Sequence, residues 1–210
     1  MPYPKNFIIL RTGVSTKKGG LTRWAKVNHK KMAKIIYECI YIGKILVMSG
    51  PDKADIESSK ILRDEIERLH LLTTQIPESK LNIPSEESEF LGKSYGRSED
   101  DKEEEEKLSL YAIARIILDL VEARKAEMAL DTVIIITHHK QSVEIQEKYN
   151  RDVFRDKHHL TFGGVVAGSG IWMRQTAIET ARETQLLGSE PITILLHDKI
   201  PKIRVVEIKK

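Results

Sequence analysis

Short apolar runs alternate along most of the chain with segments in which apolar residues recur at helical spacing. The runs Phe7–Leu10, Ile45–Met48 and "DTVIIITHH" (131–139) predict strands. The unbroken β-branched run of the third is typical of a strand that is buried on both faces. Near the end of the chain, "PITILLHD" (191–198) and "KIRVVEI" (202–208) predict two further strands, and the short connection between them suits a hairpin.

Helical spacing of apolar residues predicts three helices between these strands. They are marked by Met32, Ile35, Ile36, Cys39 and Ile40, then by Ile56, Leu62, Ile66 and Leu69, and then by Leu110, Ile113, Ile117, Leu120 and Val121. Asp52 is a candidate N-cap for the second helix. Strands that alternate with helices predict an α/β fold, a three-layer sandwich in which helices flank a mainly parallel central sheet.

Two segments do not follow this pattern. Residues 77–106 are polar and acidic and contain Pro and Gly, so they predict a long surface insertion, partly disordered, in a single domain of residues 1–210. Residues 162–191 begin with the turn-rich stretch "FGGVVAGSGIWM" and continue with a stretch that suits a helix and a strand equally well.

Composition and charge narrow the classes of function. The net charge of +3 is too small to indicate a nucleic-acid partner, and no aromatic interleaving accompanies the lysines of residues 17–34. Those lysines solvate a helix face or form a surface for an acidic partner. The lone Cys39 excludes an intrachain disulfide and favours a reducing compartment, and no apolar run is long enough for a membrane span. We therefore expect a cytoplasmic protein.

Polar residues follow three of the predicted strands directly. The strands end in Arg11-Thr12-Gly13, Ser49-Gly50-Pro51 and Thr137-His138-His139, and Lys53 would begin the second helix. In open α/β sheets, ligands bind beyond the carboxyl ends of the strands, and a helix N-terminus attracts anions. If the strands are neighbours, these residues predict a phosphate or carboxylate site with no metal and no cofactor. Each feature also has a purely structural interpretation. The segment Arg11-Thr12-Gly13 would then be an ordinary turn, Lys53 a solvated helix residue and His138 a structural residue.

The same pieces, in this order, resemble the histidine phosphatase superfamily, which includes the cofactor-dependent phosphoglycerate mutases. Its members open with a strand that ends in Arg-His-Gly, followed by Leu-Thr before the first helix; here these are Arg11-Thr12-Gly13 and Leu21-Thr22. Lys53-Ala54 stands where the second strand's motif has Arg-Ala. His138 matches the histidine of the late Ser/Thr-His-Gly motif, with His139 in place of the glycine. The resemblance runs from Phe7 to about Gln146.

The resemblance implies phosphoryl transfer in two steps. The histidine of Arg-His-Gly attacks phosphorus, while two arginines and the second histidine bind the phosphoryl oxygens. These anion-binding positions correspond here to Arg11, Lys53 and His138, and Thr12 could donate a hydrogen bond. A carboxylic acid that follows soon after the second helix protonates the leaving group, and Glu78 is the nearest match. Without the resemblance, Glu78 is a loop carboxylate.

Three departures from the superfamily pattern affect this chemistry. Thr12 stands at the nucleophile's position, where a hydroxyl is a poor nucleophile without an adjacent base. Lys53 replaces the planar fork of an arginine with a point charge, and His139 replaces a glycine. We therefore expect a catalytically impaired protein, a pseudoenzyme, that binds an anionic or phosphorylated ligand or a protein partner. A divergent phosphomonoesterase or phosphomutase and a structural assembly subunit are the alternatives, and a homodimer stays open.

One further pair of histidines is a weak signal for a ligand site. His158-His159 lies beside Arg155 and Lys157, so that a metal or an anion is conceivable there. Adjacent histidines usually point in different directions, and no pattern of carboxylates near this pair supports a zinc set.

Overall fold

The computed structural model describes residues 3–39, 43–75, 81–92, 109–154, 170–174 and 192–196. A six-stranded sheet runs through the middle of this part of the chain in the order β3-β2-β4-β1-β5-β6. The strands are β1 (Asn6–Arg11), β2 (Ile45–Ser49), β3 (Ser85–Glu87), β4 (Thr132–Thr137), β5 (Gly170–Arg174) and β6 (Ile192–Leu196). Pairing is parallel from β3 to β1, and β5 is antiparallel to both of its neighbours.

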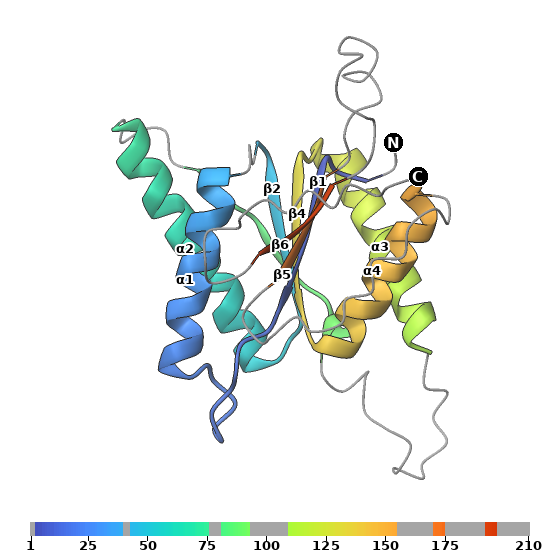
Figure 1. The fold of residues 1–210 in the computed structure, drawn as a ribbon, viewed down its shortest axis with the longest axis horizontal. Coiled ribbons are helices and arrows are strands. Elements are labelled where there is room, and N and C mark those ends of the chain that lie inside the picture. Colours follow the sequence, from blue (N-terminus) through green and yellow to red (C-terminus); the bar gives the residue numbers. More distant parts are fainter. Residues whose placement is uncertain are drawn as a thin grey trace, which may run out of the picture.

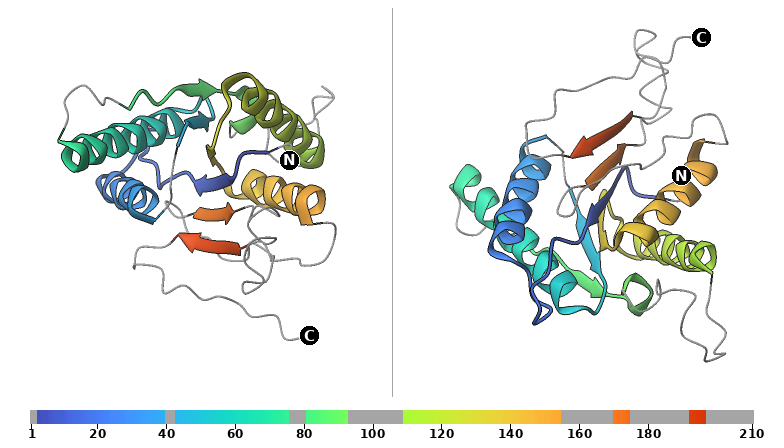
Figure 2. Two further views of the ribbon diagram at one scale, coloured as in Figure 1. Left: turned by 90° about the horizontal axis from the view of Figure 1, so that it is seen from above. Right: turned by 60° about the horizontal axis from the view of Figure 1, so that its bottom comes forward.

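Helices cover both faces of the sheet. Figures 1 and 2 show α1 (Arg23–Cys39) and α2 (Lys53–Thr74) on one face and α3 (Leu110–Met128) and α4 (His139–Phe154) on the other. The predicted α/β sandwich with a mainly parallel central sheet is confirmed. No helix in the described ranges has the length and apolar content needed to cross a membrane.

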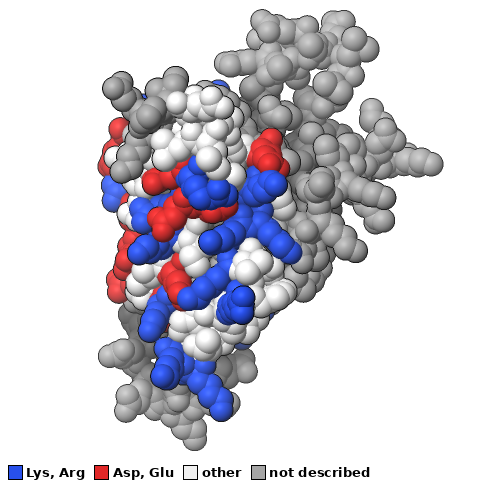
Figure 3. Space-filling view, turned by 90° about the vertical axis from the view of Figure 1, so that its left-hand side faces the viewer, with Lys and Arg blue, Asp and Glu red and all other residues white. Residues whose placement is uncertain are grey.

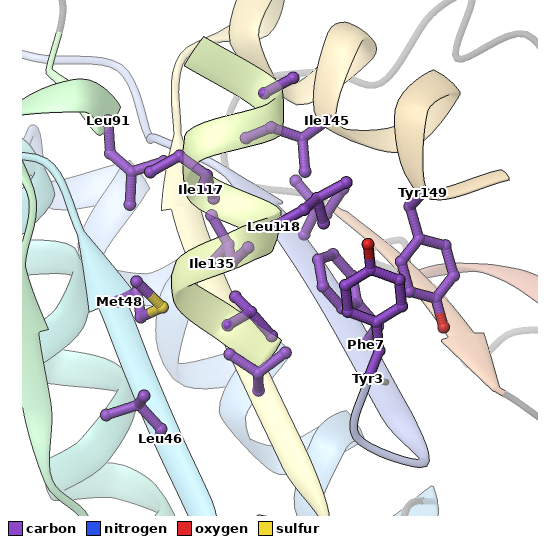
Figure 4. Close-up of a cluster of buried hydrophobic side chains, with 14 of the residues drawn as sticks. Tyr3, Phe7, Leu46, Met48, Leu91, Ile117, Leu118, Ile135, Ile145 and Tyr149 are labelled. Carbon is purple, nitrogen blue, oxygen red and sulfur yellow. The ribbon is translucent and has the colours of Figure 1, made fainter. Parts of the chain in front are cut away.

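Alternation of side chains along the central strands builds a core on each face. Phe7 and Ile135 point toward α3 and α4, where they pack with Ile117 and Tyr149 (Figure 4). Ile9 belongs to the same cluster. The intervening residues of the same strands pack against α1 and α2 in a second cluster, which includes Ile8, Leu10, Ile134, Met32 and Ile66. Burial on both faces explains why these strands read as continuous apolar runs.

Three segments differ from the sequence-based expectation. Residues 81–92 belong to the fold rather than to a surface insertion: β3 pairs with β2, Leu91 in the short 3₁₀ helix η1 (Glu89–Leu91) is fully buried, and Ile83 is also in the core. Strand β5 lies within the stretch whose structure the sequence left open. Helix α4 follows β4 at once and was not predicted. The rest of 77–106 and the predicted strand 202–208 lie outside the described residues.

Candidate functional site

The three strands that end in polar residues are neighbours. Strand β4 lies between β1 and β2, with Arg11 opposite Thr137 and Ser49 opposite Ile136. The Thr12 amide donates to the Thr137 carbonyl at 2.9 Å, so the parallel register continues into the first residue beyond β1. Because parallel strands end at one edge of the sheet, the loops after β1, β2 and β4 meet there, as the sequence led us to expect.

A buried carboxylate connects two of these loops. Asp55 is fully buried, and its Oδ1 accepts a hydrogen bond from the Thr12 hydroxyl. Its other oxygen, Oδ2, lies 3.4 Å from His138 Nε2, within ion-pair distance but without the geometry of a hydrogen bond. The Asp52 Oδ2 atom lies 3.2 Å from the same nitrogen. The acid cluster, defined as Thr12, Asp52, Asp55 and His138, is thus the centre of the candidate site.

The start of α2 places both carboxylates. Asp52 is the N-cap residue and Asp55 lies in the first turn, three residues later, so the two side chains share one side of the helix end. The positive end of the helix stabilises negative charge here. Asp52 takes the cap position that the sequence predicted, but its carboxylate accepts no hydrogen bond from the helix and approaches His138 instead.

The carboxylates set the charge of His138. The neighbouring Asp55 raises the pKa of the imidazole above its ordinary value, partial burial opposes this effect, and Asp52 adds to it. His138 therefore keeps its proton to a higher pH than an isolated imidazole does. An imidazolium between carboxylates is neither a nucleophile nor a general base, although it can hold an anion or donate a proton.

Two glycines allow the backbone to approach closely around this cluster. A Cβ atom on Gly50 would lie 2.5 Å from Asp55 Oδ2 and 2.8 Å from the Leu91 carbonyl oxygen. A Cβ on Gly13 would lie 2.7 Å from the Cβ of Ala25 in α1. The strand exits after β1 and β2 are therefore packed directly against α1, Asp55 and η1, and a larger residue at either glycine would push the site apart.

The other predicted site residues have different surroundings. Arg11 is half-buried at the end of β1. Lys53 is exposed, and its stem lies toward the loop at Gly20, where a Cβ would be 3.6 Å from Lys53 Cε. His139 begins α4 and is exposed. Glu78 lies outside the described residues. The structure thus brings Thr12 and His138 to one carboxylate and directs the Lys53 stem toward Gly20.

Sequence reasoning missed Asp55 and gave Asp52 only a capping role. The available signal was the position of both acids, immediately around the Lys53-Ala54 pair that aligns with the superfamily motif. An acid in the first turn of a helix is usually solvated and stabilising, so its identity alone gave no reason to expect burial. Burial of Asp55 depends on the loops of β1 and β4, which are distant in sequence.

Hydrogen bonds from one glutamine hold η1 against the site. Gln141, in the first turn of α4, is 2% exposed, and its Nε2 donates to the carbonyl oxygens of Phe90 at 3.0 Å and Gly92 at 2.9 Å. The Thr137 hydroxyl lies 2.8 Å from Gln141 Oε1 and 3.1 Å from the Leu91 carbonyl oxygen. These contacts hold the chain after β3 against the end of β4, next to Gly50.

Acidic side chains lie beside the lysines of α1. Figure 3 shows lysines and arginines interspersed with acidic residues over the face built by α1 and α2. Lys26 Nζ lies 2.5 Å from Glu57 Oε1, and a groove between the helices is lined by Arg23, Lys26, Lys30 and Lys60 together with Val27, Ile61, Glu57 and Asp64. This mixture matches a solvated helix face better than a uniform basic surface.

Comparison with known proteins identifies the fold. No family model matches the sequence, and no curated protein matches it. Solved structures are similar over most of their length. An Escherichia coli protein provisionally named alpha-ribazole-5′-P phosphatase has 9% identity and a TM-score of 0.50, with 92% of this chain and 96% of that chain covered. A Nakamurella multipartitia protein provisionally named phosphohistidine phosphatase SixA has 10% identity and a TM-score of 0.50, with 94% and 96% covered. The Rv3214 protein of Mycobacterium tuberculosis has 12% identity and a TM-score of 0.51, with 91% and 96% covered.

The chain has the histidine phosphatase fold. At identities of 9–12% the similarity concerns the fold and not the chemistry. The acid cluster therefore decides which chemistry the fold supports in this chain.

Proposed function

We propose that this protein is a histidine-phosphatase-like protein that has lost phosphoryl transfer and acts by binding. The observation that carries the proposal is the place of Asp55. In the reaction that the resemblance implies, the phosphoryl group lies against both the nucleophile's position and the second histidine. Here the Asp55 carboxylate accepts a hydrogen bond from Thr12, at the first position, and lies 3.4 Å from His138 Nε2, at the second. The Asp55 carboxylate thus contacts the two positions between which the phosphoryl group would bind.

The contact between Thr12 and Asp55 does not rescue a nucleophile. A threonine hydroxyl needs a base to become reactive. A carboxylate is a much weaker base than the alkoxide it would have to generate, so Asp55 is poorly suited to activate the hydroxyl. The negative charge of Asp55 also repels an incoming phosphoryl group. The divergent phosphomonoesterase or phosphomutase therefore has less support than a binding protein.

Phosphate release from an aryl phosphate tests the loss of catalysis. We expect no turnover by the wild type above that of His138→Ala, assayed side by side in the same buffer. We also expect Thr12→His to be inactive, because the Asp55 carboxylate still lies where the phosphoryl group would bind. An active Thr12→His beside an inactive wild type would still support loss of the nucleophile. Turnover by the wild type that His138→Ala abolishes would overturn the proposal.

The bound partner is either an anionic or phosphorylated ligand or another protein. A substitution of Asp55 distinguishes these two kinds of partner. An anion held by Arg11 and His138 must displace the Asp55 carboxylate or bind beside it, whereas a protein partner on the surface need not. We expect 10-fold increases in inorganic phosphate, with EDTA present, to leave the melting temperature of the wild type unchanged and to raise that of Asp55→Asn by mass action. A phosphate-dependent rise in the wild type that His138→Ala abolishes would show instead that the pocket takes an anion with Asp55 in place.

A further inference from the structure

We propose that Asp52, Asp55 and His138 form a binding site for a divalent transition-metal ion of the zinc type. Each residue contributes one ligand atom, a carboxylate oxygen from each aspartate and an imidazole nitrogen from the histidine. These atoms all lie within 4.8 Å of one another. Imidazole and carboxylate together suit Zn²⁺ and similar ions, and three protein ligands are the usual number for a zinc site with one open position.

The surroundings of one buried carboxylate oxygen are a second observation that points to the ion. The Asp55 side chain is 0% exposed, its Oδ1 is occupied by Thr12, and its Oδ2 has no hydrogen-bond partner. A buried carboxylate oxygen that accepts no hydrogen bond is unfavourable. The same oxygen lies 3.4 Å from His138 Nε2, on the side where a cation would contact both. A metal ion would supply the missing partner.

The two spacings from His138 to the aspartates agree with tetrahedral coordination. Zinc binds nitrogen and oxygen at roughly 2.0–2.1 Å, so two ligands of a tetrahedral ion are about 3.4 Å apart and two adjacent ligands of an octahedral ion about 3.0 Å. His138 Nε2 lies 3.2 Å from Asp52 Oδ2 and 3.4 Å from Asp55 Oδ2.

Thr12 has a positioning role in this site. Its hydroxyl holds Asp55 Oδ1, which fixes the direction of the ligand oxygen Oδ2. Partners of this kind, one step removed from the metal, typically change affinity about 10–100-fold when they are removed. The residue at the nucleophile's position would thus serve the ligand set, and the fourth metal position would remain for water or an external ligand.

Zinc titration of the full-length chain, stripped with a chelator, tests the site. Calorimetry or competition with a chromophoric chelator should show one tight equivalent of Zn²⁺. We expect Asp52→Asn and His138→Gln each to weaken binding at least about 100-fold, more than loss of an outer partner does. Thr12→Val should weaken it about 10–100-fold, and Thr12→Ser, which keeps the hydroxyl, should restore it. Asp52 is 43% exposed, so Asp52→Asn is expected to leave the fold intact.

The exposed neighbour His139 provides the matched control. His139→Gln should leave the tight equivalent unchanged, because this residue is not part of the cluster. Tight binding that survives both Asp52→Asn and His138→Gln would overturn the assignment, as would its loss in His158→Gln/His159→Gln. The titration contains no phosphate ester, so its outcome is independent of whether phosphoryl transfer has been lost.

Discussion

Replacing Gln141 with methionine is expected to lower the free energy of unfolding by about 3 kcal/mol, since each hydrogen bond contributes about 1 kcal/mol and buried acceptors left unpaired add to the loss. Gln141 Nε2 donates to the carbonyl oxygens of Phe90 and Gly92, and its Oε1 lies 2.8 Å from the Thr137 hydroxyl. Methionine has a similar length and volume, so packing changes little. The variant isolates the polar contacts that hold η1 against the sheet.

A second glutamine on the same helix supplies the matched control. Gln146 is 1% exposed, and neither its Oε1 nor its Nε2 has a hydrogen-bond partner. Gln146→Met should therefore raise the free energy of unfolding by about 1 kcal/mol, because it removes buried polar atoms that make no bond. Urea unfolding of the wild type and the two variants measures both effects. Equal losses in the two variants would show that packing, rather than hydrogen bonding, determines the cost at these positions.

The apolar pattern predicted the elements that are buried on both sides. Strands β1, β2 and β4 carry apolar residues toward each layer of helices, so their sequences show an unbroken signal. The spacing of Ile113 and Ile117 similarly revealed α3. Strand β3 reads Ser-Glu-Glu and lies at the edge of the sheet, where its place is determined by pairing with β2. Such pairing is a long-range property, and no local pattern of residues 77–106 reports it.

Helix α4 shows a related limit. It begins at His139, directly after β4, and its first turn carries Gln141 and Ser142, both buried and polar. Their hydrogen bonds go to backbone and side-chain atoms of the folded protein rather than to solvent. Because buried glutamines are uncommon, a polar segment of this composition resembles a loop when only the sequence is considered.

The candidate site was predictable in its location but not in its charge. The polar ends of three strands, read with the rule that ligands bind at the carboxyl edge, identified Thr12 and His138 as neighbours of one site. The same reading predicted a site dominated by cations. Asp55 alters that balance, because its carboxylate is buried between the two residues. Both proposals above depend on this buried carboxylate.

Acidification is expected to destabilise the protein through His29, a buried histidine beneath the loop that follows β1. The Ser58 hydroxyl donates to the Ala54 carbonyl oxygen at 2.7 Å, so the 2.9 Å contact between Ser58 Oγ and His29 Nε2 requires Nε2 to be the donor. His29 Nδ1 then carries no proton and has no partner. Burial lowers the pKa of His29 from 6.5 to about 4, because a proton on Nδ1 would place a charge in the core.

The sign of the effect follows from the lowered pKa. Above pH 6.5 His29 is neutral in both states, and as the pH falls toward 4 the unfolded state binds the proton first, so stability is lost. Between pH 7 and pH 5 this loss amounts to about 2 kcal/mol, and to about 3 kcal/mol in full. His138 acts in the opposite direction, because its raised pKa contributes stability that is present at low pH and lost as the pH rises.

Comparison of the wild type with His29→Gln separates these two histidines. Glutamine retains an N–H donor for Ser58 but does not titrate, while His138 is unchanged in both proteins and cancels from the difference. We expect the wild type to lose about 2 kcal/mol more than His29→Gln between pH 7 and pH 5, measured by urea unfolding at each pH. The same pH dependence in both proteins would mean that the Nδ1 atom of His29 reaches a proton acceptor or water in the folded state. The neutral histidine beneath Gly13 would then not be a determinant of acid stability.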